Sequence, residues 1–214
     1  MDVRGAQVVL VVGAATTVGR SITEALADEG AQLFLTDVVD GHLDDVVERV
    51  ARRTGRRPER QVLRVTDPDA WGVSVAAVEA RFGRLDLVVN AAEWDPGVRW
   101  RDAGADQWAR AVDINLMGAV HGFTAAVPAL RASRGRFLVV ACDRPDGVVG
   151  ASARSAAITF AQAVGGELAP QVTVVTAVVR DGADGSVGSR IVAAMREGVM
   201  RITVDSPEGN LSYS

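Results

Sequence analysis

The chain has 214 residues, of which 48% are hydrophobic and 23% charged, and its formal net charge at pH 7 is −4. This length and apolar content predict a folded domain with a full core and exclude a disordered chain. The acidic balance provides no basic surface for nucleic acid. No leader segment precedes the first apolar run and no run is long enough to cross a bilayer, so we expect a cytoplasmic protein with no nucleic-acid or membrane partner.

Two residue types limit the chemistry further. All 23 basic residues are arginines, which excludes a lysine base or a Schiff base. Cys142 is the only cysteine, so an intrachain disulfide is excluded and a reducing compartment is expected. The histidines and this cysteine lack the spacing of a metal site, and we expect no bound metal.

Apolar runs that are typical of buried strands alternate with segments of helical periodicity. We expect strands at Val8–Val12, Gln32–Thr36, Gln61–Val65, Leu85–Val89, Arg136–Ala141, Val172–Val178 and Arg201–Val204. We expect helices at Val18–Glu29, Asp44–Arg53, Asp69–Phe82, Asn115–Ala132, Ala151–Leu168 and Ser189–Val199.

This alternation predicts an α/β fold, a doubly wound Rossmann-type parallel sheet of about seven strands with helices on both faces. No repeat or linker divides the chain, so residues 1–205 are expected to form one domain. Residues 206–214 form a polar tail, which we expect to be loose or docked on a partner.

The first strand leads into a glycine turn and a helix, an arrangement that directs helix-terminal N–H groups at a phosphate. The segment Gly13-Ala-Ala-Thr-Thr17-Val-Gly19 resembles the Thr-Gly-x-x-x-Gly-x-Gly loop of short-chain dehydrogenases/reductases. Asn90-Ala91-Ala92 is similar to that family's Asn-Ala-Gly, and Asn115-Leu-Met-Gly118 to the Asn-x-x-Gly that opens its long fifth helix. The resemblance covers most of the chain.

The resemblance implies a nucleotide site at the carboxyl ends of the strands. Asp37 closes the second strand, as in the family members that prefer NAD over NADP, so NAD is the implied cofactor. The implied cofactor-binding residues are Gly13, Thr17, Val18, Gly19, Asp37, Asn90 and Ala91. Gly13 and Gly19 could instead serve only tight packing, and Asp37 could be a turn residue.

The nucleotide end also departs from the family pattern. Val12 replaces the threonine that opens the loop, and Thr17 replaces its middle glycine. Arg64 stands where the family often has an aspartate that contacts adenine, so it is either a solvated charge or a group that pairs with an anionic ligand. Arg180-Asp181 replaces the Pro-Gly that frames the nicotinamide. These changes put dinucleotide binding in question.

The positions that correspond to the family's catalytic residues depart further from the family pattern. In the family a tyrosine transfers the proton, a lysine tunes that tyrosine, a serine holds the substrate oxygen and an asparagine supports a water relay. Here those positions are Gly150, Arg154, Cys142 and Asn115, so only the asparagine remains. Arginine cannot relay a proton, and the only tyrosine, Tyr213, lies in the tail. Cys142 is either a nucleophile or, as we expect, a buried inert thiol.

Three functions stay open. The first, which we favour from the sequence, is a non-catalytic family member that binds a ligand or a partner, either in a homo-oligomer or with a catalytic homologue. The helices at residues 115–132 and 151–168, which are rich in small residues, would form that contact. The second is an NAD(H)-dependent oxidoreductase with unusual catalytic residues. The third is non-redox chemistry on the same fold, with Glu93, Asp95 and Asp143 as acid/base candidates.

Overall fold

The computed structural model describes residues 6–143, 147–180, 185–205 and 212–213, with the backbone alone for the last two. Eight strands form one sheet in the order β3-β2-β1-β4-β5-β6-β7-β8. Seven of them run parallel, and only β8 is antiparallel, to β7. The strands are β1 (Val8–Val12), β2 (Gln32–Asp37), β3 (Glu59–Val62), β4 (Leu87–Asn90), β5 (Arg136–Asp143), β6 (Thr173–Arg180), β7 (Arg201–Val204) and β8 (Ser212–Tyr213).

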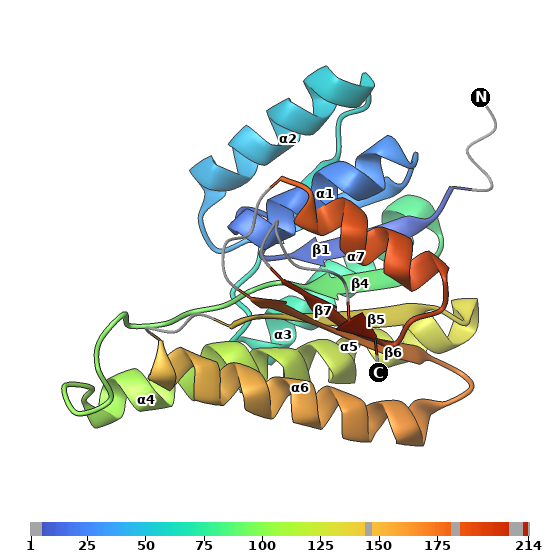
Figure 1. The fold of residues 1–214 in the computed structure, drawn as a ribbon. Helices are drawn as coiled ribbons and strands as arrows, with labels where there is room; N and C mark the ends of the chain where they lie inside the picture. Colours follow the sequence, from blue (N-terminus) through green and yellow to red (C-terminus); the bar gives the residue numbers. More distant parts are fainter. Residues whose placement is uncertain (1–5, 144–146, 181–184, 206–211, 214) are drawn as a thin grey trace.

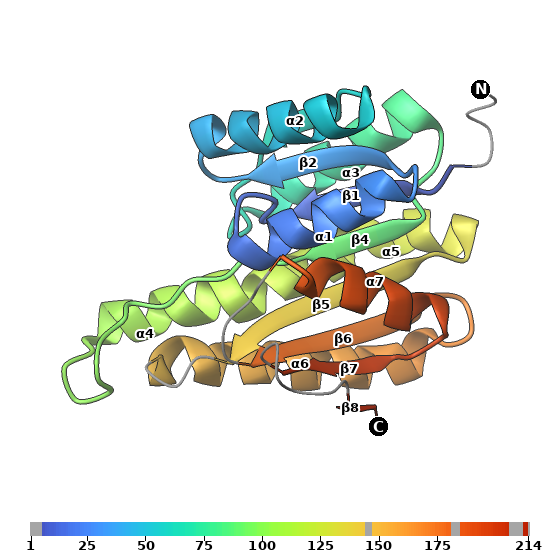
Figure 2. The same ribbon diagram turned by 45° about the horizontal axis from the view of Figure 1, so that its top comes forward.

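Helices cover both faces of this sheet (Figures 1 and 2). One face carries α1 (Thr17–Asp28), α2 (Asp40–Thr54) and α7 (Val187–Arg196). The other carries α3 (Pro68–Phe82), α5 (Gly118–Ser133) and α6 (Val148–Leu168). A short helix, α4 (Ala105–Ala111), continues through the π-helical segment η2 (Val112–Met117) into α5. No helix among the described residues has the length and apolar character that crossing a membrane requires.

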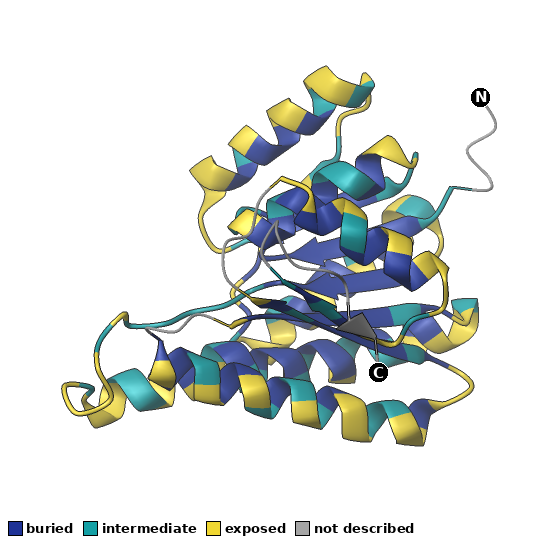
Figure 3. Cartoon of the chain, viewed as in Figure 1, coloured by how far each residue is buried: buried dark blue, intermediate teal, exposed yellow. Residues whose placement is uncertain are grey.

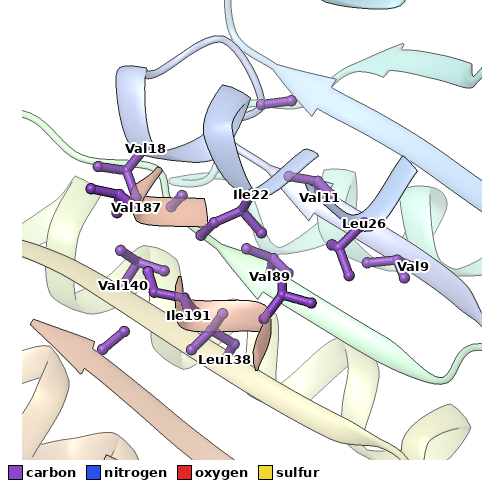
Figure 4. Close-up of a cluster of buried hydrophobic side chains, with 14 of the residues drawn as sticks. Val9, Val11, Val18, Ile22, Leu26, Val89, Leu138, Val140, Val187 and Ile191 are labelled. Atoms are coloured by element: carbon purple, nitrogen blue, oxygen red, sulfur yellow. The ribbon is translucent and has the colours of Figure 1, made fainter. Parts of the chain in front are cut away.

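The strand sequences explain why the sheet is buried on both faces. All five residues of β1 and all four of β4 are buried, so successive side chains supply opposite layers of the core. In the layer shown in Figure 4, Val9 and Val11 of β1 meet Ile22 and Leu26 of α1. Figure 3 shows the same division: buried strands and inner helix faces, with exposed outer helix faces.

The predicted α/β architecture is confirmed, but several boundaries were wrong. β3 begins at Glu59 and ends at Val62, earlier than predicted. It is an edge strand whose last valine is 47% exposed, while the buried Leu63 and Val65 follow it in irregular structure. The apolar residues at 63 and 65 therefore gave a strand signal outside the strand.

Helical and tail boundaries also differ from the prediction. α4 and η2 were not predicted, and through them the helix expected from Asn115 begins ten residues earlier, at Ala105. α6 begins at Val148 rather than at Ala151. Within the predicted tail, residues 212–213 pair with β7 instead of being loose; residues 206–211 and 214 lie outside the described residues.

The order of the strands determines where a cleft of the kind that binds nucleotides can form in this sheet. Chain connections run outward in opposite directions from β1 and β4, so that the carboxyl ends of these neighbours form the switch point of the sheet. Gly13 follows β1 and Ala91 follows β4 at this point. We call the part of this edge at β1 and β2 the nucleotide end, and the part where β5 and β6 finish the catalytic end.

Candidate functional site

The glycine loop is fixed by close contact with the neighbouring backbone. Gly13 has φ +76°, and a Cβ placed on it would lie 2.5 Å from the backbone nitrogen of Ala92. A Cβ on Gly19 would collide with the Gly13 carbonyl oxygen. Thr16 caps α1, because its hydroxyl oxygen accepts from the Gly19 N–H at 3.0 Å. Both glycines are therefore required by packing, whether or not a phosphate binds there.

Asp37 lies against this loop. Its Oδ2 accepts from the backbone N–H of Ala15 at 2.9 Å, and its Oδ1 accepts from the N–H of Val38 at 2.7 Å. The carboxylate thus ties the end of β2 to the turn that begins α1. From this position it also lines the large cavity of the cleft.

That cavity has a volume of about 690 Å³ and lies over the ends of β1, β2 and β4. Its walls combine the loop after β1, the segment after β3 and one side of α4 and η2. Arg64 lines it, so the residue that replaces the family's aspartate faces the site, although its side chain is exposed. The lining residues are Val12, Gly13, Thr16, Asp37, Val38, Leu63, Arg64, Val65, Thr66, Ala92, Glu93, Trp94, Asp106, Ala109, Arg110, Asp113 and Ile114.

Asn115 holds the segment after β4 in place. It is 4% exposed and lies in the π-helical turn. Its Oδ1 accepts from the Trp94 N–H at 3.0 Å, and its Nδ2 donates to the Trp94 carbonyl at 2.8 Å and to the Ala111 carbonyl at 2.9 Å. This amide therefore holds the main chain of Trp94, and this fixes the main-chain positions of its two neighbours, Glu93 and Asp95.

Those two carboxylates meet Arg154 of α6. Arg154 Nη1 lies 3.5 Å from Asp95 Oδ2, and Arg154 Nε lies 4.0 Å from Glu93 Oε2. The Arg154 side chain is only 5% exposed and each carboxylate side chain 12%. Arg154 Nε and Nη2 and Asp95 Oδ2 are buried without a hydrogen-bond partner. This group, which we call the Arg154 cluster, is paired in charge but incompletely hydrogen-bonded.

Asp95 takes the space beside Gly150, where the family would carry the tyrosine side chain. A Cβ on Gly150 would collide with Asp95 Oδ2 and would approach Arg154 Nη1 to 2.6 Å. A Cβ on Gly147, one turn earlier, would collide with the same carboxylate oxygen. Two glycines at the start of α6 thus make room for one acidic side chain. The sequence analysis had placed Asp95 only near the mouth of the cleft.

A second cavity, of about 310 Å³, lies at the catalytic end. Cys142, Arg154 and Arg180 line it together, and it shares no lining residue with the large cavity. Cys142 is 8% exposed, in agreement with the prediction of a buried thiol. Arg180 lies 3.8 Å from both Asp143 and Asp205; Asp181 lies outside the described residues. Glu93 of the Arg154 cluster lines the large cavity, and Arg154 lines the second one.

The remaining predicted cofactor residues, Thr17, Val18, Gly19, Asn90 and Ala91, are not among those that line the large cavity. Val18 is buried against the sheet, whereas Thr17 is exposed, so its β-branched side chain does not fill the loop. Asn90 is 4% exposed, its Oδ1 accepting from the Ala92 N–H at 3.4 Å, and Ala91 is also buried. No side chain here replaces the missing tyrosine hydroxyl, among the residues whose side chains are described.

Several lining residues were missed from the sequence. Arg110, on the unpredicted helix α4, lies with its guanidinium 4.6 Å from the ring centre of Trp94, and both line the large cavity. His121 on α5 has Nδ1 3.2 Å from the Val65 carbonyl oxygen. His42 is exposed. No group of three or more metal-ligating side chains occurs in the described part of the chain.

The fold and the loop define a protein of the Rossmann-type α/β class, and comparison with known proteins specifies the family. The family model described as short chain dehydrogenase matches residues 7–190. The chain therefore belongs to the short-chain dehydrogenase/reductase family, as the motifs had indicated. At positions 142, 150 and 154 the chain carries cysteine, glycine and arginine, where the sequence resemblance implies a serine, a tyrosine and a lysine.

Among curated relatives, the chain is 34% identical over 137 residues to a trans-4-hydroxycyclohexanecarboxylate dehydrogenase of Sinomonas cyclohexanicum, covering 62% of this chain and 53% of that protein. It is 28% identical over 155 residues to an L-fucose dehydrogenase of Bos taurus, covering 72% and 54%. The chain thus spans about half the length of these relatives.

Solved structures agree with the fold. The apo form of LigD from Sphingobium sp. strain SYK-6 superposes with a TM-score of 0.86 at 20% identity, covering 94% of this chain and 90% of that chain. An alcohol dehydrogenase from the archaeon Thermococcus sibiricus, complexed with 5-hydroxy-NADP, gives a TM-score of 0.80 at 21% identity, covering 97% and 99%.

Proposed function

We propose that this chain is an NAD(H)-dependent oxidoreductase with unusual catalytic residues, the second of the functions left open by the sequence. The observation that carries the proposal is the 690 Å³ cavity at the switch point of the sheet, lined by Gly13 and Asp37, in a chain that belongs to a dehydrogenase family. The named relatives are dehydrogenases, which supports oxidoreduction over the non-catalytic function favoured from the sequence.

The adenosine half of NAD fits the residues that are present. The N-terminus of α1, behind the Gly13 turn, offers N–H groups and a positive dipole end for the diphosphate. Asp37, which lies at the end of β2 and lines the cavity, would accept hydrogen bonds from the ribose hydroxyls. A 2′-phosphate at this carboxylate would be repelled, so we expect NAD(H) to bind more tightly than NADP(H).

The chemistry at the other end needs different residues from those of the family. Bound nicotinamide supplies or accepts a hydride. Arg154, which lines the smaller cavity, has donors for the oxygen of a carbonyl or alcohol but cannot release a proton. Asp95, 3.5 Å from that guanidinium, is the carboxylate that we assign to hold the proton. This assignment requires Asp95 to become accessible when substrate binds, because its Oδ2 is buried.

Titration of NADH and NADPH into the purified protein, followed by calorimetry and nicotinamide fluorescence, tests the proposal. We expect NADH to bind, and Asp37→Ala to weaken it by about tenfold, since a hydrogen bond to a charged group contributes about 1.5 kcal/mol or more. Asp40→Ala, which alters an exposed acid at the start of α2, is the control. NAD⁺ reduction is then screened with 4-hydroxycyclohexanecarboxylates, L-fucose and simple secondary alcohols. Absence of NADH binding at millimolar concentration would reject the proposal.

A non-catalytic subunit remains the second candidate, and one observation favours it. Asp95 fills the space beside Gly150, so the position of the family's proton-transferring residue is occupied by a buried ion pair. Such a subunit would associate with a second copy or with a catalytic homologue through α5 and α6. Light scattering after size-exclusion chromatography, with and without a coexpressed family member, would measure this association. NADH binding together with NAD⁺ reduction by the isolated chain would reject the candidate.

A further inference from the structure

The 310 Å³ cavity at the catalytic end has a wall of mixed character. Its polar part carries charges of both signs, on Arg154, Arg180 and Asp143, and includes two hydroxyl-bearing residues of α6, Ser155 and Thr159. Its apolar part comes from β5, β6 and α6 and consists of Ala141, Ala151, Ile158 and Val178. The volume lies at the lower limit of pockets that bind small molecules, about 300 Å³, so a ligand of this cavity must be small.

The ion pairs of both arginines in this wall are longer than hydrogen bonds. Arg154 Nη1 lies 3.5 Å from Asp95 Oδ2, and Arg154 Nε lies 4.0 Å from Glu93 Oε2. The Arg180 guanidinium lies 3.8 Å from each of its two carboxylate partners. Arg154 Nε and Nη2 are in addition buried without a hydrogen-bond partner. Buried donors in this state are rare in native proteins, and a ligand that accepts hydrogen bonds is one way to complete them.

The charges around the two arginines argue against a ligand that is itself an ion. Each guanidinium already has two carboxylates within 4.0 Å. An anion bound to either guanidinium would be repelled by those carboxylates, and a cation would be repelled by the guanidiniums. A neutral hydroxyl group avoids both penalties, because it accepts from a guanidinium and donates to a carboxylate at the same time.

We propose that the 310 Å³ cavity is a binding site for a neutral, polyhydroxylated compound of the size of a hexose. Its hydroxyl groups accept hydrogen bonds from Arg154 and Arg180 and donate to Asp143, and the less polar side of its ring packs against Ile158 and Val178. This inference rests on the proposed function only where it makes this compound the alcohol that the oxidoreductase oxidises. The binding itself requires no cofactor.

Saturation-transfer difference NMR with the purified protein tests the proposal through ligands that share one ring. D-Galactose is compared with D-galacturonate and D-galactosamine, and D-glucose with D-glucuronate and D-glucosamine. We expect the neutral hexose of at least one series to bind about tenfold more tightly than the acid and the amine of the same ring, because only the charged ligands are repelled.

Asp143→Asn tests the cavity wall itself, because it removes the charge of an exposed side chain and keeps its size. The variant should bind the hexose about fivefold more weakly, as expected for the loss of one hydrogen bond, and should bind the acid less unfavourably relative to the hexose. Asp205→Asn is the matched control. Asp205 lies at the same 3.8 Å from Arg180 but is not among the residues that line the cavity, so hexose affinity should stay within about twofold.

Two results would overturn the inference: no binding of either neutral hexose at about 100 mM, or acids that bind as tightly as the hexoses. An effect of Asp205→Asn as large as that of Asp143→Asn would also overturn it, because the sugar would then not be recognised by the cavity wall. NADH binding without hexose binding rejects this inference alone. Hexose binding without NADH binding rejects the proposed oxidoreductase function and leaves the hexose site in place.

Discussion

The two ends of the cleft differ in what their glycines face. At the nucleotide end, a Cβ on Gly13 would meet the backbone of Ala91 and Ala92, and one on Gly19 would meet the Gly13 carbonyl. At the catalytic end, a Cβ on Gly147 or Gly150 would meet the end of the Asp95 side chain. One end is therefore determined by main-chain packing, and the other by a side chain that can move.

Because of this difference, the residues that the fold requires are not the residues that the chemistry would use. The loop after β1 must keep Gly13 and Gly19 for the chain to pack as this sheet, whatever it binds. The start of α6 carries no such requirement, because a Cβ on Gly147 or Gly150 would meet side-chain atoms rather than backbone. Packing alone therefore accounts for these two glycines, and cofactor binding has to be measured with the ligand itself.

The largest loss of stability is expected for alanine at Gly13, in contrast to alanine at Gly150. Gly13→Ala combines a positive φ of 76° with backbone contact at 2.5 Å, and strain plus overpacking should lower the free energy of unfolding by about 4 kcal/mol. Gly150→Ala should stay within about 1 kcal/mol of wild type, because alanine favours a helix and Asp95 can move aside. Urea unfolding followed by circular dichroism measures both.

Equal losses in these two variants would break the comparison. A large loss for Gly150→Ala would mean that Asp95 is held as rigidly as the backbone around Gly13. The Gly72→Ala variant in α3 is a suitable reference, since nothing lies within 4 Å of a Cβ at that position.

A smaller effect is expected within the Arg154 cluster. Arg154→Met leaves Glu93 and Asp95 buried without their cation and should cost about 3 kcal/mol of stability, the low end of the range for breaking a buried ion pair. Adding Asp95→Asn removes one of the stranded charges. The double variant should therefore be more stable than Arg154→Met alone, by about 1 kcal/mol.

Urea unfolding of the two single variants, the double variant and wild type gives the coupling energy between Asp95 and Arg154. A double variant that loses the sum of the two single losses would show that the pair is not coupled. Asp95 and Arg154 would then be no more than two independently placed charges.

Much of the fold was predictable because the strands are apolar runs of the right length and order. β1 and β5 lie close to their predicted residues, since buried parallel strands give an unbroken apolar signal. The short helix α4 was not predictable from periodicity. It has seven residues, and its first turn depends on the Gln107 side chain accepting from the Gly104 N–H at 3.0 Å. Helix periodicity is too weak a signal over two turns.

The candidate site was predictable only where it depends on local sequence. The loop at Gly13 and Gly19 and the carboxylate of Asp37 follow from their position after β1 and β2. The contact of Asp95 with Arg154 joins residues 59 positions apart, and it arises because Asn115 fixes Trp94 and α6 has glycine at 147 and 150. Neither spacing nor composition predicts an arrangement that depends on three separate parts of the chain. The sequence showed that position 150 is not a tyrosine, but it did not show that Asp95 lies beside that position.

The smallest effect is expected for an exposed ion pair, which sharpens the contrast with the Arg154 cluster. The Arg53 guanidinium donates to Asp28 Oδ1 at 2.6 Å and lowers the pKa of that carboxyl below its usual value of about 3.8, against the opposing effect of burial. A lowered pKa in the folded state stabilises the protein above about pH 3.8, and this contribution is lost as the pH falls through the folded-state pKa. The Asp28 side chain is 43% exposed and its partner 51%, so solvent screening keeps the contribution small.

Asp28→Asn should lower Tm by roughly 1–2 °C at pH 7, and the difference from wild type should shrink toward zero near pH 2, as read by circular dichroism. A difference that persists at pH 2 would assign the loss to packing of α1 against α2 rather than to charge.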